Sequence, residues 1–381
     1  MIRVTFIVTS TERAGAQVAL LRLLPLVALQ GFEPSVISLA TPNALSEEFA
    51  RAGVPLHHLG VPPSSISLRA LGRLVGLLKE DRPDLVQGWM YHGNLAAQLA
   101  SFLIPNSPPV IWGIRGTNTI LTRERKLTAL TIWLGGRLSA RPEAIIYNSR
   151  ASAREHASAL RYRREREVVI PNGFDTTQFV PSPEARARIR TDLGVPNDAV
   201  LIGLVARFHQ DKDHRTFLKA LSRVHGSHPE VRAVLVGSGT NPANANLEAL
   251  IAETRTQDLI YLLGERSDMP KVAAAFDIAC NSSVSEAFPN AVGEAMSCGV
   301  PCVVTDVGDS RWLIGDTGRV VQPATPEALA KGLSELVQLG PERRGILGAH
   351  ARERIANEFS IQATAERYAL TYQTVIRRGF V

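Results

Sequence analysis

Residues 282–308 read SSVSEAFPNAVGEAMSCGVPCVVTDVG, and they follow a short apolar run at residues 278–281. Pro289 suits the first turn of a helix, so we predict a helix from about Pro289 to Met296. The apolar run at residues 302–305 then predicts a second buried strand. A helix between two short buried strands is the repeating unit of parallel sheets, and the stretch therefore predicts an α/β fold.

The same alternation of short apolar runs and amphipathic stretches extends in both directions through the chain. A Pro-rich segment from Pro171 to Pro183 divides the expected strands into two series, and we place a linker there. We therefore predict two doubly wound α/β domains, with a ligand in the cleft between them. The predicted strands are residues 4–8, 36–39, 85–87, 110–113 and 144–147, then 201–205, 233–236, 260–263, 278–281, 302–305 and 319–321; the predicted helices include residues 16–30, 68–79, 216–225 and 326–339.

The composition is that of a globular protein with large apolar cores. The chain has 381 residues, of which 45% are hydrophobic and 20% charged, and this length suggests two or three domains. No apolar run reaches the ~18–20 residues of a membrane-spanning helix, and the N-terminal MIRVTFIVTS is interpreted as a strand rather than a signal peptide. An odd number of cysteines argues against a disulfide framework, and their spacing argues against zinc. We expect a cytoplasmic protein with three small core cysteines, Cys280, Cys298 and Cys302.

The net charge of +6 arises mainly in residues 115–166, where twelve basic side chains face four acidic ones. Such a segment favours polyanions, namely nucleic acid, anionic lipid headgroups or pyrophosphate. A solvated surface is the alternative for any single arginine. Because few aromatic residues interrupt the segment, we do not expect nucleic acid as the partner.

Two glutamates, Glu286 and Glu294, stand on either side of the predicted helix start. If the residues between them were helical, the eight-residue separation would span roughly 12 Å, beyond the roughly 5–9.5 Å of paired glycosidase carboxylates. We therefore interpret them as binding two parts of an extended ligand with many hydroxyl groups. Backbone amides at residues 288–292 predict a phosphate site between them. Two solvated glutamates on a surface helix are the alternative.

Arg207 directly follows the predicted strand at residues 201–205, and Lys212 lies at the start of the next helical region. A guanidinium and an ammonium suit a pyrophosphate, whose charge must be neutralised when a glycosyl bond breaks. Asp211 and Asp213 form an Asp-x-Asp pattern, but the lysine between them disfavours a metal ion. We interpret one of them as a helix cap.

In the N-terminal half, residues 9–17 (TSTERAGAQ) join the first predicted strand to the first helix. Gly15 would let backbone amides approach a phosphate or a sugar closely. The loop lacks the G-x-G-x-x-G pattern, which argues against a dinucleotide dehydrogenase, and the G-x-G at residues 237–239 is a weak signal. His92 lies just past a predicted strand end, where a structural and a functional histidine both fit.

Together these residues resemble the retaining glycosyltransferase family 4, of the GT-B architecture. The resemblance spans nearly the whole chain, and the separation of the Arg207–Lys212 pair from the Glu-x7-Glu is its most specific part. It implies two Rossmann-like domains facing a central cleft. The implied domains are residues 1–175 for the acceptor, residues 176–360 for the nucleotide-sugar, and a helix at residues 361–381 that crosses back to the N-terminal domain. The matching motifs are Gly15 in the first loop, Val169–Gly173 with Phe179, Arg207 with Lys212, residues 234–239, Leu263-Gly-Glu, Glu286 and Glu294 with the residues that follow it, and Thr305–Gly308.

The resemblance also implies a reaction. A sugar would pass, with retention and without an essential metal or other cofactor, from a nucleotide-diphosphate donor, expected to be a UDP-sugar. The acceptor would be a glycan or a lipid-pyrophosphate-linked glycan in cell-envelope or exopolysaccharide synthesis. Arg207 and Lys212 would neutralise the pyrophosphate, Glu294 would hold the ribose, and Glu286 would contact the donor sugar with His92 beside it. Further implied donor contacts are Gly15, Ala16, Gly237, Arg266, Phe288, Pro289, Asn290, Ala291 and Val292; implied acceptor-side residues are Gln17, Arg115 and Asn118. Gln17 stands where many relatives carry an acid, which leaves its contact open.

Other interpretations stay open at this point. The basic segment from Leu121 to Leu138 fits either a helix that docks on the anionic inner face of the cytoplasmic membrane or an ordinary packed helix. A GT-B-like sugar-nucleotide epimerase or hydrolase would share the donor site. A non-catalytic nucleotide-sugar-binding protein would share the two-domain fold, without a need for the charges of Arg207 and Lys212.

Overall fold

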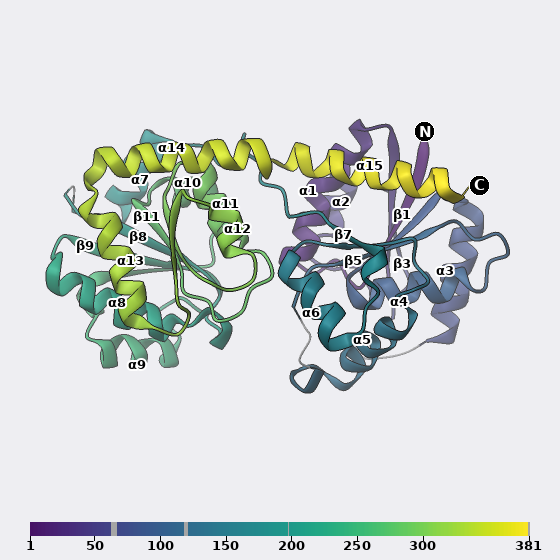
Figure 1. Cartoon of the computed structure of the whole chain (residues 1–381), viewed down its shortest axis with the longest axis horizontal. Helices are drawn as coiled ribbons and strands as arrows, with labels where there is room; N and C mark the ends of the chain where they lie inside the picture. Colours follow the sequence, from purple (N-terminus) through teal and green to yellow (C-terminus); the bar gives the residue numbers. More distant parts are fainter. Residues whose placement is uncertain (62–66, 118–120, 197, 380–381) are drawn as a thin grey trace. The chain divides into compact units, whose positions relative to one another are not determined.

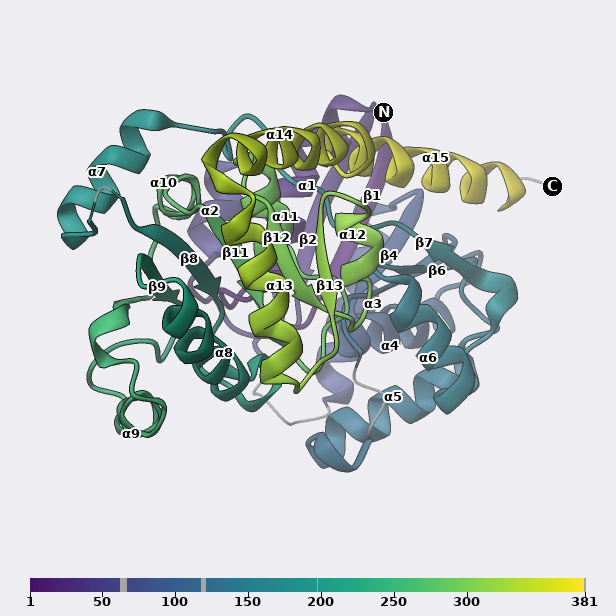
Figure 2. The same ribbon diagram turned by 60° about the vertical axis from the view of Figure 1, so that its left-hand side comes forward.

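The computed structural model describes residues 1–61, 67–117, 121–196 and 198–379, so the predicted acceptor-side residue Asn118 lies outside the described residues. The chain folds as two compact units: unit 1 is Met1–Gly173 with Ile361–Val381, and unit 2 is Phe174–Ser360. Each unit is a parallel β-sheet with helices on both faces (Figures 1 and 2). The predicted fold of two doubly wound α/β domains is therefore confirmed. None of the helices in the described ranges is long and apolar enough to cross a membrane.

Unit 1 contains a seven-stranded sheet of order β3-β2-β1-β4-β5-β6-β7, in which all neighbours run parallel. Its central strands are buried on both faces, which is why they read as unbroken apolar runs in the sequence. Two short edge strands, β3 and β7, were not predicted. The strands are β1 Ile2–Val8, β2 Phe32–Ser38, β3 Leu56–His58, β4 Leu85–Trp89, β5 Val110–Ile114, β6 Ala144–Tyr147 and β7 Glu167–Val169.

The helices of unit 1 form two layers, one on each face of this sheet (Figure 1). One layer contributes to a core that includes the fully buried Tyr368 and Tyr372. The helices of that layer are α1 Gly15–Leu29, α2 Ser46–Arg51 and α15 Ile361–Gly379; those of the other are α3 Leu68–Asp81, α4 Met90–Ser101, α5 Lys126–Leu138 and α6 Arg150–Leu160, with 3₁₀ turns η1 Leu121–Arg123 and η2 Arg164–Arg166.

Unit 2 contains a six-stranded parallel sheet of order β10-β9-β8-β11-β12-β13. The strands are β8 Val200–Val205, β9 Val231–Val236, β10 Ile260–Gly264, β11 Ile278–Asn281, β12 Cys302–Thr305 and β13 Gly318–Val321. One face is covered by α8 His214–Ser227, α9 Ala245–Thr254 and α13 Pro326–Gln338, and the other by α7 Pro183–Leu193, α10 Met269–Ala274, α11 Asn290–Ser297, α12 Ser310–Ile314 and α14 Gly340–Glu358, with 3₁₀ turns η3 Gln210–Lys212 and η4 Gln257–Leu259.

The stretch that predicted the fold forms the β11–α11–β12 unit. Helix α11 begins at Asn290 with Pro289 as its N-cap, so the predicted helix is confirmed to within a residue at each end. Glu286 lies in the loop before the helix and Glu294 inside the helix, as predicted. Because only part of the segment between them is helical, the figure of roughly 12 Å for eight helical residues does not apply to their separation. The three cysteines are buried and unbridged, as predicted.

Candidate functional site

The loops that carry the predicted donor residues meet at one edge of the unit 2 sheet. Strands β8, β11 and β12 are neighbours, and because they run parallel, the loops that follow them share the carboxyl edge of the sheet. Arg207 and Lys212 follow β8, and Glu286 and Glu294 follow β11. Ligands of doubly wound sheets bind at this edge.

Lys212 and Glu286 form the centre of this edge. The Lys212 Nζ lies 2.5 Å from Glu286 Oε1, and both side chains are largely buried, with 21% and 12% exposed. Ser283 Oγ donates to the same oxygen at 2.8 Å, and Asn281 Nδ2 lies 3.3 Å from it. The carboxylate is therefore held by a cation and two polar side chains. Asn281 and Ser283 were not predicted as site residues, although a polar run directly after a buried strand is a signal for them.

The loop before Glu286 is fastened to the loop that carries Lys212. Ser282 Oγ donates to the Lys212 carbonyl at 2.7 Å, and the Val284 amide donates to the Asp211 carbonyl at 2.8 Å. These bonds hold the backbone of both loops in register, so the Lys212–Glu286 pair is positioned from both sides.

The loop that follows β12 fastens the other side of the Glu286 segment. Thr305 Oγ1 donates to the Ser283 carbonyl at 2.6 Å, and the Asp309 amide donates to the Ala287 carbonyl at 3.1 Å. Gly308 has a φ of +55°, and a Cβ placed there would lie 2.3 Å from the Glu286 carbonyl oxygen. Only glycine allows this close approach of the two backbones.

Both aspartates of the Asp-x-Asp pattern contact groups of the protein itself. Asp213, with a φ of +44°, is the N-cap of α8, and its carboxylate accepts the Thr216 amide at 3.1 Å. The Asp211 carboxylate lies 3.2 Å from His209 Nδ1. The helix-cap interpretation is confirmed for Asp213. Within the described ranges, no group of three or more His, Cys, Asp or Glu side chains is arranged to hold a metal ion.

Arg207 is exposed directly after β8, and among the described residues its guanidinium has no hydrogen bond or ion pair. The β9–α9 loop passes beside it. Gly237 has a φ of +141°, and a Cβ there would lie 2.4 Å from the Ala206 carbonyl oxygen. The Phe208 amide donates to the Ser238 carbonyl at 2.7 Å. The predicted donor residue Gly237 thus brings its loop against the backbone next to Arg207.

The start of α11 offers fewer amides than predicted. The Val292 and Gly293 amides both donate to the Pro289 carbonyl, at 3.2 and 3.4 Å, and proline has no amide hydrogen. Within the predicted range 288–292, the Val292 amide is therefore already engaged inside the protein, and Pro289 offers no amide. Glu294 lies a full turn inside the helix and is partly exposed.

Two other predicted donor residues make internal contacts. The Phe288 side chain is buried and stacks on Phe174 with ring centroids 6.1 Å apart, so only its backbone is left for a ligand. The Arg266 guanidinium bonds both carboxylate oxygens of Asp268, at 2.8 and 2.7 Å, and this hydrogen bonding lowers the pKa of Asp268. A donor contact of Arg266 would compete with that pair.

The predicted residues of unit 1 lie near the carboxyl ends of its strands. Gly15 begins α1 and is exposed, and the Ala16 carbonyl accepts a hydrogen bond from Trp89 Nε1 at 3.0 Å. Gln17 is only 9% exposed and belongs to the buried side of α1. Their contacts with a donor or an acceptor stay predictions.

Arg115 has a structural role that the sequence did not reveal. Its Nη2 donates to Tyr368 Oη at 2.6 Å, its Nη1 donates to Asn172 Oδ1, and its guanidinium lies 4.1 Å from the centre of the Trp89 ring. The side chain thereby fastens α15 to the end of β5. The implied acceptor contact stays a prediction, and it would have to use N–H groups of the guanidinium other than those in these two bonds.

His92 lies in the first turn of α4 and is partly buried, and burial lowers its pKa below the ordinary value. It lines a cavity of about 250 Å³ whose other walls are mostly leucine. His92 is therefore uncharged at neutral pH, and its predicted place beside the donor sugar is not tested by these contacts.

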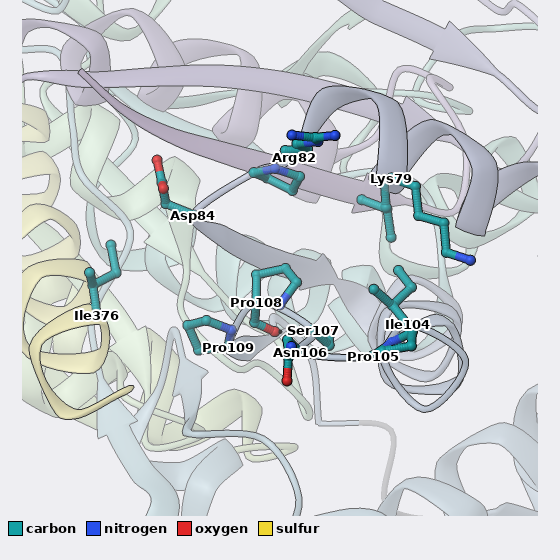
Figure 3. Close-up of a pocket in the computed structure, with 12 residues that line it drawn as sticks. Lys79, Arg82, Asp84, Ile104, Pro105, Asn106, Ser107, Pro108, Pro109 and Ile376 are labelled. Atoms are coloured by element: carbon teal, nitrogen blue, oxygen red, sulfur yellow. Dashed lines mark hydrogen bonds between the residues drawn. The ribbon is translucent and has the colours of Figure 1, made fainter. Parts of the chain in front are cut away.

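A second cavity of unit 1, of about 650 Å³, lies at the opposite edge of the sheet (Figure 3). Asp84 and Pro109, which line it, directly precede β4 and β5. Figure 3 shows Lys79 and Arg82, from the end of α3, above the loop at residues 104–109. Because parallel sheets bind ligands at their carboxyl edge, this cavity at the amino edge is not the candidate site.

Each half of the chain matches a glycosyltransferase family model. Residues 13–178 match the model of Glycosyltransferase Family 4, and residues 199–338 match that of Glycosyl transferases group 1. A D-inositol 3-phosphate glycosyltransferase of Corynebacterium jeikeium is 31% identical over 221 residues, which are 55% of this chain and 52% of that protein. A lipopolysaccharide core biosynthesis mannosyltransferase of Rhizobium meliloti is 26% identical over 217 residues, 55% of this chain and 61% of that protein. The chain thus spans between half and two thirds of the length of these curated relatives.

The fold is shared with solved structures over nearly the full length. The crystal structure of HepE of Anabaena in complex with UDP superposes with a TM-score of 0.84 at 22% sequence identity, covering 98% of this chain and 100% of that chain. At this identity the likeness establishes the two-unit architecture and nothing further about the chemistry.

Proposed function

Because the chain belongs to the glycosyltransferases of family 4 and group 1, we propose that it transfers a sugar from a UDP-sugar to a glycan or lipid-linked acceptor in the synthesis of a cell-envelope polysaccharide. The observation that carries the proposal is the buried Lys212–Glu286 pair beside the exposed Arg207 at the carboxyl edge of unit 2. The UDP and UDP-glucose complexes of HepE support uridine as the nucleoside of the donor.

The charges in unit 2 account for how such a donor would react. The bond between the anomeric carbon and the β-phosphate oxygen breaks, a bond from that carbon to the acceptor hydroxyl oxygen forms, and the leaving UDP gains negative charge and can take up the hydroxyl proton. Arg207 and Lys212 neutralise that charge, the role that a divalent metal has in other transferases. Lys212 has three N–H donors, so it can hold Glu286 and a phosphate oxygen together. Glu286 accepts from the sugar hydroxyls and Glu294 from the ribose.

The nucleotide is tested by thermal unfolding with UDP, ADP, GDP and dTDP. A ligand at a hundred times its Kd adds about 2.7 kcal/mol, which raises Tm by roughly 5–10 °C for a domain of this size. We expect that rise with UDP alone, and its loss in Glu294→Ala. The control is Glu248→Ala, an exposed glutamate in the first turn of α9. No shift with any nucleotide in folded protein contradicts the proposed donor.

The reaction class is tested by NMR of the purified protein with UDP-sugar, first alone and then with candidate acceptors. A transferase that acts with retention gives a product whose new bond has the anomeric configuration of the donor. Free sugar released without an acceptor at the same rate identifies a hydrolase, and an isomerised donor identifies an epimerase.

We also propose that α5 contacts the anionic inner face of the cytoplasmic membrane. Leu130 and Trp133 are 45% and 44% exposed, and the Arg137 guanidinium stacks 3.7 Å from the Trp133 ring centre. Apolar and cationic side chains on one exposed helix favour an interfacial position. Cosedimentation with phosphatidylglycerol vesicles should fall several-fold in an Arg125→Glu, Lys126→Glu variant, and unchanged cosedimentation contradicts the contact.

A further inference from the structure

The proposed donor site in unit 2 does not account for the cavity beside His92 in unit 1. Helix α4 contacts both α3 and α5, and the cavity of about 250 Å³ is lined by residues of all three helices. Leu39, Leu59 and His92, which also line it, follow the carboxyl ends of β2, β3 and β4. The cavity therefore lies at the edge of the sheet where doubly wound domains bind ligands.

The walls of the cavity offer almost nothing to a polar ligand. Of the sixteen lining residues within the described part of the chain, thirteen are apolar. Ser67 Oγ accepts the Ala70 amide at 3.1 Å as the cap of α3, and Thr131 Oγ1 donates to a carbonyl of its own helix. His92 is uncharged. A sugar or a peptide backbone would give up its hydrogen bonds to water here without replacing them. The lining therefore favours a hydrocarbon ligand.

The size and the mouth of the cavity fit a chain. An apolar cavity of ~150 Å³ in another protein stays dry and binds benzene, and this one is larger. Three of its leucines reach the surface, namely Leu68, Leu99 and Leu130, which are 81%, 38% and 45% exposed. Single exposed leucines are ordinary, but three around one cavity form an apolar mouth.

The helices that form the walls are cationic near that mouth. Arg69 and Arg73 of α3 are exposed, and Arg73 Nη1 donates to the carbonyl of the lining residue Leu59 at 3.0 Å. Arg125 and Lys126, also exposed, begin α5. Helices α4 and α5 contain no acidic residue, those of α3 lie at its far end, and Glu124, directly before Arg125, is the one acidic residue in the segment that leads into α5 from residue 121. The charge around the mouth therefore complements an anionic headgroup.

We propose that this cavity binds one aliphatic chain of an anionic lipid, with the lipid phosphate at Arg69, Arg73, Arg125 and Lys126. The proposal rests on the proposed function in one respect, which is that this lipid carries the acceptor. It differs from a membrane contact of α5 because a single lipid chain enters the protein.

Calorimetric titration with butyl, hexyl and octyl phosphate, each below its micelle concentration and without nucleotide, tests the binding. Each buried methylene group should lower Kd by about fourfold, and each two-carbon step should therefore lower it by more than tenfold.

Two variants test the cavity itself. Ala96→Phe, which fills the cavity, and Leu130→Gln, which makes its mouth polar, should each weaken the binding of octyl phosphate at least tenfold. Leu370→Gln, a leucine of α15 that is 65% exposed, is the matched control and should bind as the wild type does. Arg69→Glu with Arg73→Glu should weaken octyl phosphate and leave neutral octyl glucoside unchanged. Melting curves verify that each variant is folded.

Equal affinity for the three chain lengths overturns the proposal, as does wild-type affinity in both folded cavity variants. Binding to phosphatidylglycerol vesicles without binding of monomeric octyl phosphate also overturns it, and leaves only the surface contact of α5. Because no nucleotide is present, either negative result leaves the UDP shift intact. Chain-dependent binding in a protein that shows no UDP shift would instead refute the donor and retain the lipid site.

Discussion

At the scale of single residues, charge is concentrated where the proposed pyrophosphate would lie. Lys212 is largely buried and bound to Glu286, whereas Arg207, nearer the end of the same strand β8, is exposed. The desolvated ammonium is the costlier of the two to keep without a partner. The site is therefore arranged around Glu286 as the partner of Lys212 in the free protein.

Lys212→Met and Arg207→Ala should each weaken UDP binding by roughly 10–100-fold, because a hydrogen bond to a charged group contributes ~1.5–3 kcal/mol. Uridine, which has no phosphate, should bind these variants as it binds the wild type. Calorimetric titration of both ligands measures the difference. Arg215→Ala, which removes a surface partner of Glu253, is the control, and an equal loss of uridine binding would assign the two cations to another part of the ligand.

Two buried histidines should make stability depend on pH. Burial lowers the pKa of His156 in unit 1 and of His214 in unit 2 to about 4, from an ordinary 6.5. The unfolded chain then binds protons that the folded chain does not, so stability is complete above pH ~6.5 and falls by about 1.4 kcal/mol per pH unit and histidine down to pH ~4. Urea unfolding at pH 7 and pH 5 measures this loss. His156→Gln, which can retain hydrogen bonds to Tyr91 and Ser152, should lose part of it, and an unchanged pH dependence would contradict the assignment to His156.

The residues that the sequence could not place are those with distant partners. Arg207 and Lys212 were found because their position after a strand is a local property. Arg115 binds Tyr368, 253 positions away, and no local pattern shows such a pair. The burial of the Phe288 ring likewise depends on aromatic partners brought together only by the fold, Phe174, Trp312 and Phe359.

At the scale of elements, close backbone contacts hold the Glu286 loop in place. Gly308→Ala should lower stability by more than about 2 kcal/mol, because the ~1–2 kcal/mol cost of a left-handed φ adds to the clash of the new Cβ with the Glu286 carbonyl. It should also weaken UDP binding at least tenfold by displacing that carbonyl. Gly340→Ala is the matched control, since its φ is +72° and no atom lies within 4 Å of the added Cβ. It should lose only the ~1–2 kcal/mol of its left-handed φ and keep UDP binding. Equal UDP binding in the two folded variants, measured by calorimetry, would show that the loop tolerates the shift.

The sequence predicts the central strands clearly and the short edge strands poorly. Strands β6, β11 and β12 have the predicted bounds, because strands buried on both faces are unbroken apolar runs between turns. The missed strands β3 and β7 are three residues long, form the two edges of their sheet and are partly exposed. A short edge strand needs little apolar sequence, and its pairing is set by its neighbour.

At the scale of the whole molecule, each unit has its own cores. The two apolar clusters of unit 2 are built from residues 174–359 alone. A fragment of residues 174–360 should therefore fold cooperatively and bind UDP within about tenfold of the full chain, by calorimetry. A folded fragment without UDP binding would place essential donor contacts in unit 1, among them the predicted Gly15 and His92.

Unit 1 is discontinuous in sequence, and this has a consequence for synthesis on the ribosome. Its core includes Tyr368 and Tyr372 of α15, which are translated after all 187 residues of Phe174–Ser360. At ~5–20 residues per second, the nascent N-terminal sheet would wait roughly 10–40 s, and during that time the part of this face that α15 covers stays exposed beside α1 and α2. Unit 2 can fold completely during this time. The usual order, in which the N-terminal domain folds first, is therefore reversed. The uncovered sheet is then the segment of the nascent chain with most need of a chaperone.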